Sequence, residues 1–128
     1  MSAPVPSYGF IWPINGNITT YFGEGGHKGI DIDGFGRYGA AIGAAATGQV
    51  VLASWSDWGL GYHVVLDHGD GTRTVYAHLS EIWVTQGQYV GQGEAVGALG
   101  STGYSTGPHL HFEVHSGGAA VDPLAYLP

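Results

Sequence analysis

Two short histidine motifs hold the residues of this chain that are best suited to chemistry. His27 stands four positions before Asp31, and His109 and His111 flank a single leucine. On a β-strand, residues i and i+2 point to the same face about 6.6 to 7 Å apart, so the second pair should project together. A single histidine on a strand would be weak evidence for a metal site. Imidazoles combined with a carboxylate match the N and O ligands of zinc, so the motifs predict a metal site with one coordination position open.

The residues between these polar positions predict the strands that hold them. Leu110, Phe112 and Val114 alternate with the histidines, and Ile30 and Ile32 flank the aspartate in the same way. Alternation with a period of two places one set of side chains in a core and the other on the opposite face. We therefore expect a sheet with one apolar face and one chemical face.

The whole chain reads as an all-β protein. Glycine accounts for 24 of the 128 residues, and apolar residues alternate far more often than they recur at helical spacing. A two-residue turn at Asp70-Gly71 is expected to close a hairpin and to place position 63 opposite position 78. Only residues 122–127 suggest a helical turn. The predicted strands are 47–55, 62–68, 73–79, 89–90, 95–99 and 109–115.

Charge and composition limit the partners. The chain has 3 Lys+Arg against 10 Asp+Glu, a formal net charge of -7, which argues against nucleic acid and anionic membranes as ligands. There is no cysteine, so any metal must be held by histidine and carboxylate. No stretch approaches the roughly 18 apolar residues of a membrane span, and residues 1–7 lack the basic and apolar parts of a signal peptide. We expect neither feature within this chain.

The length predicts the domain organisation. A chain of 128 residues fits a single domain, here taken as 1–128 with 1–8 as a flexible N-terminal segment. A monomer is expected.

Three segments together resemble one known family. They are an H-x-x-x-D motif from His27 to Asp31, a Y-x-H-L-S motif from Tyr76 to Ser80, and a long Gly-rich stretch from 100 to 113 that ends in H-L-H-F-E. The chain is similar to the lysostaphin-type (LytM-like) zinc metallopeptidases essentially from end to end. The third segment is the most specific of these matches.

This resemblance implies a fold and an activity. The fold would be a twisted antiparallel sheet partly closed on a smaller one, with the active-site groove between loops. The activity would be zinc-dependent hydrolysis of peptide bonds in the cross-bridges or stem peptides of bacterial peptidoglycan. Zn²⁺ would be held by His27, Asp31 and His111, and the catalytic pair would be His78 and His109. The location would be secreted, periplasmic, wall-associated or virion-associated.

Several further residues have more than one interpretation. His63 and Tyr104 are candidates for the wall of a substrate groove, although an exposed strand position is the simpler interpretation of His63. His68 is expected in a turn or as a hydrogen-bonding partner, and His115 at the periphery. Glu113, like Asp33, could orient a ligand imidazole or be solvated.

Two alternatives belong to other functional classes. Some members of the family have lost these residues and regulate other hydrolases, so a non-catalytic wall module or hydrolase activator is the main alternative. All five positions are intact here, which favours an enzyme. A lipoyl- or biotinyl-type carrier is remote, because the only lysine, Lys28, stands beside His27 rather than on a hairpin of its own. The loop after Ile32 lacks the family's Gly-x-Pro-Val stretch, so the resemblance does not predict the shape of that wall of the groove.

Overall fold

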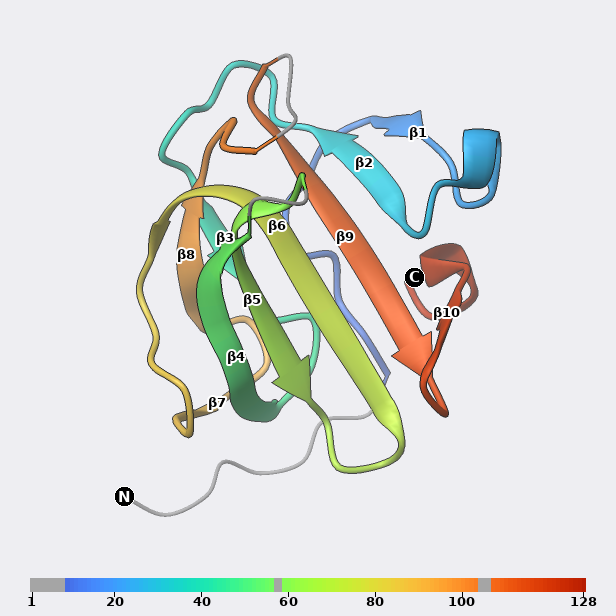
Figure 1. The fold of residues 1–128 in the computed structure, drawn as a ribbon, viewed down its shortest axis with the longest axis vertical. Helices are drawn as coiled ribbons and strands as arrows, with labels where there is room; N and C mark the ends of the chain where they lie inside the picture. Colours follow the sequence, from blue (N-terminus) through green and yellow to red (C-terminus); the bar gives the residue numbers. More distant parts are fainter. Residues whose placement is uncertain (1–8, 57–58, 104–106) are drawn as a thin grey trace.

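A computed structural model describes residues 9–56, 59–103 and 107–128 (Figure 1). The strands are β1 (Ile18–Thr20), β2 (Ile30–Asp33), β3 (Ala41–Gly43), β4 (Gly48–Ser56), β5 (Gly61–Asp67), β6 (Thr72–Ile82), β7 (Tyr89–Val90), β8 (Ala95–Leu99), β9 (His109–Ser116) and β10 (Ala119–Val121). Two short 3-10 helices, η1 (Glu24–Gly26) and η2 (Pro123–Ala125), are the helical elements of these residues. Neither is long and apolar enough to cross a membrane. The all-β prediction is confirmed.

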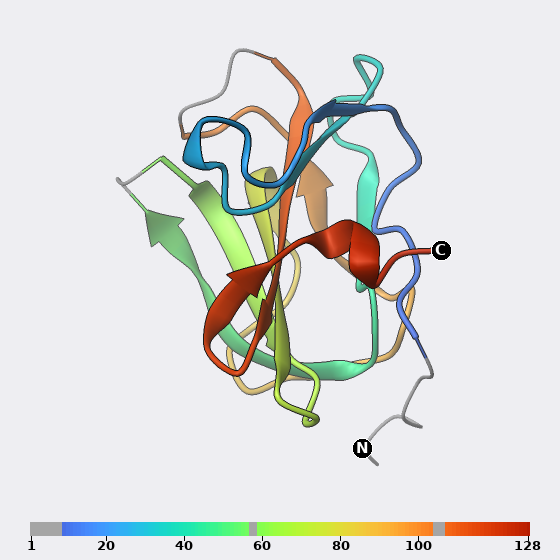
Figure 2. The same cartoon turned by 90° about the vertical axis from the view of Figure 1, so that its right-hand side faces the viewer.

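All strand pairs are antiparallel, and they form one branched sheet. The main path runs β1-β2-β9-β6-β5-β4-β7, and β10 pairs with β9. The second half of β6 also pairs with β8, which in turn pairs with β3. Figure 1 shows β3 behind the long central strands, and in the side view of Figure 2 β3 and β8 lie to the right of β4, β5 and β6. The smaller layer is therefore an extension of the main sheet, and within the described residues the sheet stays open, because β1 pairs only with β2 and β7 only with β4.

Alternation sorts the side chains of the central strands onto two faces, as predicted. The residues of β2, β5, β6 and β9 that point into the core have no exposed surface: Ile30, Ile32, Val64, Leu66, Tyr76, Leu110, Phe112 and Val114. Each such side chain stabilises the fold by about 1.5–3 kcal/mol relative to an exposed one. The residues between them, including Asp31, His109 and His111, point to the opposite face. Burial of one face therefore fixes the orientation of the other.

The hairpin between β5 and β6 differs from the prediction. Asp67 pairs with Arg73, and the His68 N–H donates to Thr72 O at 3.1 Å, so three residues rather than two form the loop. Gly69 and Gly71 have φ of 82° and 89°, and the Asp70 carboxylate between them accepts the Thr72 N–H at 3.0 Å. This side-chain turn accounts for the extra loop residue.

The pairing shifts again further along the hairpin. Tyr62 pairs with Leu79, whereas Val64 pairs with Tyr76, so β6 has one extra residue between these pairs. The predicted pairing of position 63 with position 78 is therefore wrong. His63 lies opposite a bulge formed by Ala77 and His78.

A buried polar chain joins the two layers. The Tyr76 hydroxyl accepts the Ala45 N–H at 2.9 Å and the Thr74 hydroxyl at 2.7 Å. Thr74 Oγ1 also lies 2.9 Å from Nε2 of His68, whose Nδ1 lies 2.8 Å from Thr47 O. His68 thus lies beside the turn, as expected, and its ring bonds to two threonines on the core face of the sheet rather than to a predicted metal ligand.

We predict that Tyr76→Phe destabilises the protein. The substitution leaves the Ala45 N–H without its acceptor in a fully buried place and removes the contact between Thr74 and the Tyr76 hydroxyl, which costs about 1–3 kcal/mol. Urea unfolding of the wild type and the variant measures the difference. Tyr38→Phe, at a side chain that is 65% exposed, is the matched control and should change little. Equal losses in both variants would contradict the prediction.

Candidate metal centre

The register between β2 and β9 brings the two predicted histidine motifs together. Asp31 pairs with His111, and Asp33 pairs with His109. His27 precedes β2, and its ring centroid lies 4.7 Å from that of His111. One ligand atom from each of His27, Asp31 and His111 lies within 4.8 Å of the other two. Residues 80 positions apart in the sequence therefore form one cluster.

Oδ1 of Asp31 is the centre of this cluster. It lies 3.1 Å from Nε2 of His27, 2.9 Å from Nδ1 of His111 and 3.8 Å from Nε2 of His109. Nε2 of His27 is buried and has no hydrogen-bond partner among the described residues, because its contact with the carboxylate lacks hydrogen-bond geometry. A buried polar atom without a partner is costly unless another group binds it. Two imidazoles and a carboxylate are a donor set that suits a divalent metal such as zinc, so the residues present fit a metal ion.

Asp31 and His111 stabilise each other's charged forms. Burial raises the pKa of Asp31, but the hydrogen bond from His111 and the nearby imidazoles outweigh it and hold the pKa at about 2. Burial lowers the pKa of His111, but its bonds to Asp31 and Glu113 outweigh burial and raise the pKa to about 9. The Asp31 carboxylate is thus ionised at neutral pH, and a cation at Nδ1 of His111 would replace a proton there.

The bulge in β6 turns His78 toward the same cluster. His78 has φ of 65°, a left-handed conformation that is unusual for a residue other than glycine. Its ring centroid lies 4.8 Å from that of His109 and 6.0 Å from that of His111. His78 belongs to the sheet but breaks its alternation, so a side chain that would otherwise face the core joins the polar face.

Both members of this histidine pair are held by main-chain oxygens. Nδ1 of His78 lies 2.6 Å from Thr102 O, and Nδ1 of His109 lies 3.0 Å from Gly107 O. A carbonyl oxygen can only accept, so the proton of each neutral ring is on Nδ1 and Nε2 is the atom that can take up another. Burial, His109 and His111 lower the pKa of His78 to about 4 against the opposing bond to Thr102. His78 is therefore neutral at physiological pH.

Glu113 extends the cluster along β9. Its Oε2 lies 2.7 Å from Nε2 of His111, and its Oε1 lies 2.6 Å from Nε2 of His115. Glu113 is buried, so it is not solvated, and His115 is connected to the cluster rather than peripheral. The alternation of β9 places these residues on one face, but only the structure shows that their side chains join.

The remaining predicted residues have mixed outcomes. His63 is buried, with Nδ1 3.1 Å from Gly61 O, so the expectation of an exposed position is wrong. Asp33 accepts the Phe35 N–H at 2.9 Å and stabilises the turn after β2. Tyr104 lies outside the described residues. Sequence reasoning missed Thr102, whose carbonyl holds a candidate catalytic ring; its place in the Gly-rich segment was the only signal.

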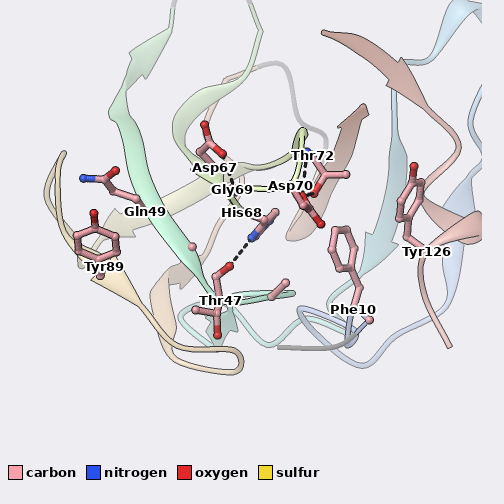
Figure 3. A pocket seen from close by; sticks show the side chains of 13 residues that line it. Phe10, Thr47, Gln49, Asp67, His68, Gly69, Asp70, Thr72, Tyr89 and Tyr126 are labelled. Atoms are coloured by element: carbon pink, nitrogen blue, oxygen red, sulfur yellow. Dashed lines mark hydrogen bonds between the residues drawn. The ribbon is translucent and has the colours of Figure 1, made fainter. Parts of the chain in front are cut away.

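Two pockets differ in their relation to this cluster. One, of about 490 Å³, lies beside the cluster, with Asp31 and His109 in its lining together with residues of β1 and of the loop before β9. The other, of about 520 Å³, is lined by Phe10, Tyr126 and His68 among others (Figure 3). It contains no residue of the candidate metal centre. Of these two pockets, the first is the one that could bring a ligand to the cluster.

Residues 25–123 match the sequence profile of Peptidase family M23. The chain belongs to this family. The match includes the whole cluster and most of the sheet that carries it. The predicted family resemblance is therefore confirmed.

Proteins similar to this M23 chain carry different names. It is 41% identical over 129 residues to the murein hydrolase activator NlpD of Salmonella dublin, covering 99% of this chain and 33% of that protein. It is 42% identical over 119 residues to lysostaphin of Staphylococcus staphylolyticus, covering 89% of this chain and 23% of that protein. The chain thus spans a third or less of the length of these relatives.

A solved structure supports the same fold. The crystal structure of a zinc-containing peptidase from Vibrio cholerae superposes with a TM-score of 0.83 at 31% identity, covering 94% of this chain and 41% of that one. The strand arrangement described above is therefore the M23 peptidase fold. The relatives thus include both an antimicrobial peptidase, lysostaphin, and a murein hydrolase activator, NlpD.

We predict that His78 makes the metal-free protein less stable in acid. Its pKa is about 4 in the folded protein and about 6.5 in an unfolded chain, so the unfolded state binds more protons between these values and stability falls as the pH is lowered. His78→Asn keeps an N–H donor but does not titrate. Relative to this variant, the free energy of unfolding of the wild type should fall by up to about 3 kcal/mol between pH 7 and pH 4. The measurement is urea unfolding with a chelator present, and a constant difference across this range would refute the assignment.

Proposed function

We propose that this M23 chain is a zinc-dependent endopeptidase that hydrolyses peptide bonds in peptidoglycan. One observation carries the proposal. Three convergent ligand atoms, from His27, Asp31 and His111, lie beside a second pair of imidazoles, His78 and His109, that are not needed to hold the ion. A site that only bound metal would have no use for this pair.

His27, Asp31 and His111 would be the zinc ligands. Three protein ligands leave a coordination position for water or substrate, as in catalytic rather than structural zinc sites. When bound, zinc lowers the pKa of a water molecule and polarises a carbonyl. The ionised Asp31 carboxylate offsets part of the charge of the ion.

His78 and His109 would move protons and stabilise charge. Each ring has its proton on Nδ1, fixed by a carbonyl oxygen, so each can accept a proton at Nε2. Hydrolysis of a peptide bond needs a base for water, a donor to the developing oxyanion and an acid for the leaving amine. The two rings, whose centroids are 4.8 Å apart, could share these roles. His109 is the nearer to Asp31 and is our choice for the base.

The substrate class rests on the family and on the shape of the site. The cluster opens into a pocket of about 490 Å³ at the edge of the sheet, which would admit a peptide segment. One relative, the murein hydrolase activator NlpD, is named for the hydrolysis of murein, which supports this substrate class. Peptidoglycan peptides, and a periplasmic, secreted or wall-associated location, follow as proposals for this chain.

A second candidate function is activation of another hydrolase. It is favoured by the 41% identity with the activator NlpD over 99% of this chain. An activator would not need the His78–His109 pair. The two functions therefore differ in whether the purified chain cleaves peptidoglycan by itself.

The test is digestion of peptidoglycans with different cross-bridges by the purified, zinc-loaded protein alone. We expect newly formed amino termini, identified by mass spectrometry, which also name the bond that is cut. The activator would be established instead if the chain alone released no new termini from any substrate, and if a separate wall hydrolase digested peptidoglycan faster with this chain than without it.

We predict that the histidine variants fall into two classes that differ in their zinc content. His111→Ala should lose both zinc and cleavage, because it removes a ligand. His78→Ala and His109→Ala should keep near-stoichiometric zinc while the cleavage rate falls by roughly 10²-fold or more. Metal content and rate are measured on the same samples. If His109→Ala lost zinc and His111→Ala kept it, the ligand assignment would be reversed.

A further inference from the structure

A buried carboxylate behind the candidate metal centre joins two imidazoles. The two oxygens of Glu113 are divided between Nε2 of His111, at 2.7 Å, and Nε2 of His115, at 2.6 Å. The Glu113 side chain is only 10% exposed. Burial raises the pKa of Glu113, but the two hydrogen bonds and the charges of the imidazoles outweigh it and lower the pKa overall. This carboxylate is built into the fold rather than left at its surface.

The local structure leaves little freedom at this position. On β9, residues 111, 113 and 115 share one face, and Val75 of β6 pairs with Glu113. From the other side, Gly29 approaches so closely that a Cβ there would lie 2.9 Å from Cγ of Glu113 and 2.2 Å from Phe112 O. Any side chain at Gly29 would displace either the glutamate or the strand. The glycine beside Lys28 therefore makes room for this carboxylate.

The hydrogen bonds settle which nitrogen of His111 faces the cluster. Nε2 is directed to Glu113, and Nδ1 is directed to Oδ1 of Asp31, at 2.9 Å, the same oxygen that lies 3.1 Å from Nε2 of His27. Rotating the ring by 180° would remove both contacts. A carboxylate can only accept, so in the metal-free protein both nitrogens of His111 carry protons. A metal that replaces the proton on Nδ1 would leave the remaining proton on Nε2, facing Glu113.

We propose that Glu113 is a positioning residue that presents Nδ1 of His111 to the metal, and that His115 holds Glu113 in place. The inference rests on the zinc site proposed above. It assigns to Glu113 the orientation and proton position of one ligand, and to His115 the orientation of the carboxylate. Partners of this kind, placed behind a ligand, typically contribute 10–100-fold to metal affinity.

The test measures zinc affinity at one neutral pH by competition with a chromophoric chelator. Glu113→Ala should weaken zinc binding about 10–100-fold. Glu113→Gln keeps an oxygen that can accept from Nε2 of His111, so it should recover part of this loss. His115→Ala should weaken binding less than Glu113→Ala. Arg73→Gln, at the position that pairs with His115 across the sheet, is the control and should leave the affinity unchanged.

A second readout separates positioning from general destabilisation. In the zinc-loaded wild type, ¹⁵N-edited NMR should show a proton on Nε2 of His111 that exchanges slowly with water, and Glu113→Ala should lose that protection. Thermal unfolding of the metal-free variants shows whether they fold. A merely structural role for Glu113 would change the unfolding temperature without changing zinc affinity in the folded protein.

The outcomes distinguish this inference from the proposed function. If the wild type binds no zinc, the proposed function fails. If the wild type binds zinc and folded Glu113→Ala and Glu113→Gln bind it equally well, the inference is wrong while the zinc site stands. If Glu113→Ala weakens binding but His115→Ala matches the wild type, the part assigned to His115 is wrong.

Discussion

The antiparallel pairing of β2 with β9 is the constraint on which the rest of the site depends. It places Asp31 directly opposite His111, and the same register places Ile30 opposite Phe112 in the core. A slip of one residue would turn the polar set inward and the apolar set outward. Burying these apolar side chains therefore also determines that a carboxylate and an imidazole meet on the outer face.

The site combines this regular geometry with one local irregularity. The strands by themselves deliver Asp31, His109, His111 and Glu113 to one face at regular intervals. His78 reaches that face only because β6 contains an extra residue and a left-handed φ there. β-Bulges commonly re-aim side chains next to active sites, and here the bulge is matched by a main-chain oxygen that receives the re-aimed ring.

Hydrogen bonds on this face fix the orientation of each histidine ring, by holding one of its two nitrogens. Main-chain carbonyls bind Nδ1 of His78 and His109, whereas a buried carboxylate binds Nε2 of His111. The imidazole proposed as a ligand thus differs from the proposed proton carriers in which nitrogen it presents to the centre. The fold assigns these roles through simple donor and acceptor chemistry, because carbonyls and carboxylates only accept.

Much of this could be predicted from the sequence, since periodicity and motif spacing are local. Alternation around Ile30 and Leu110 determined the all-β class and the two-faced sheet, and the histidine motifs determined the family and the candidate ligands. The tertiary structure alone decided which side chains meet. The length of the β5–β6 loop, the bulge at His78 and the contact of Glu113 with two imidazoles depend on register shifts and close packing between strands distant in sequence. These follow from the balance of turn hydrogen bonds and core burial over the whole sheet, which no single segment specifies.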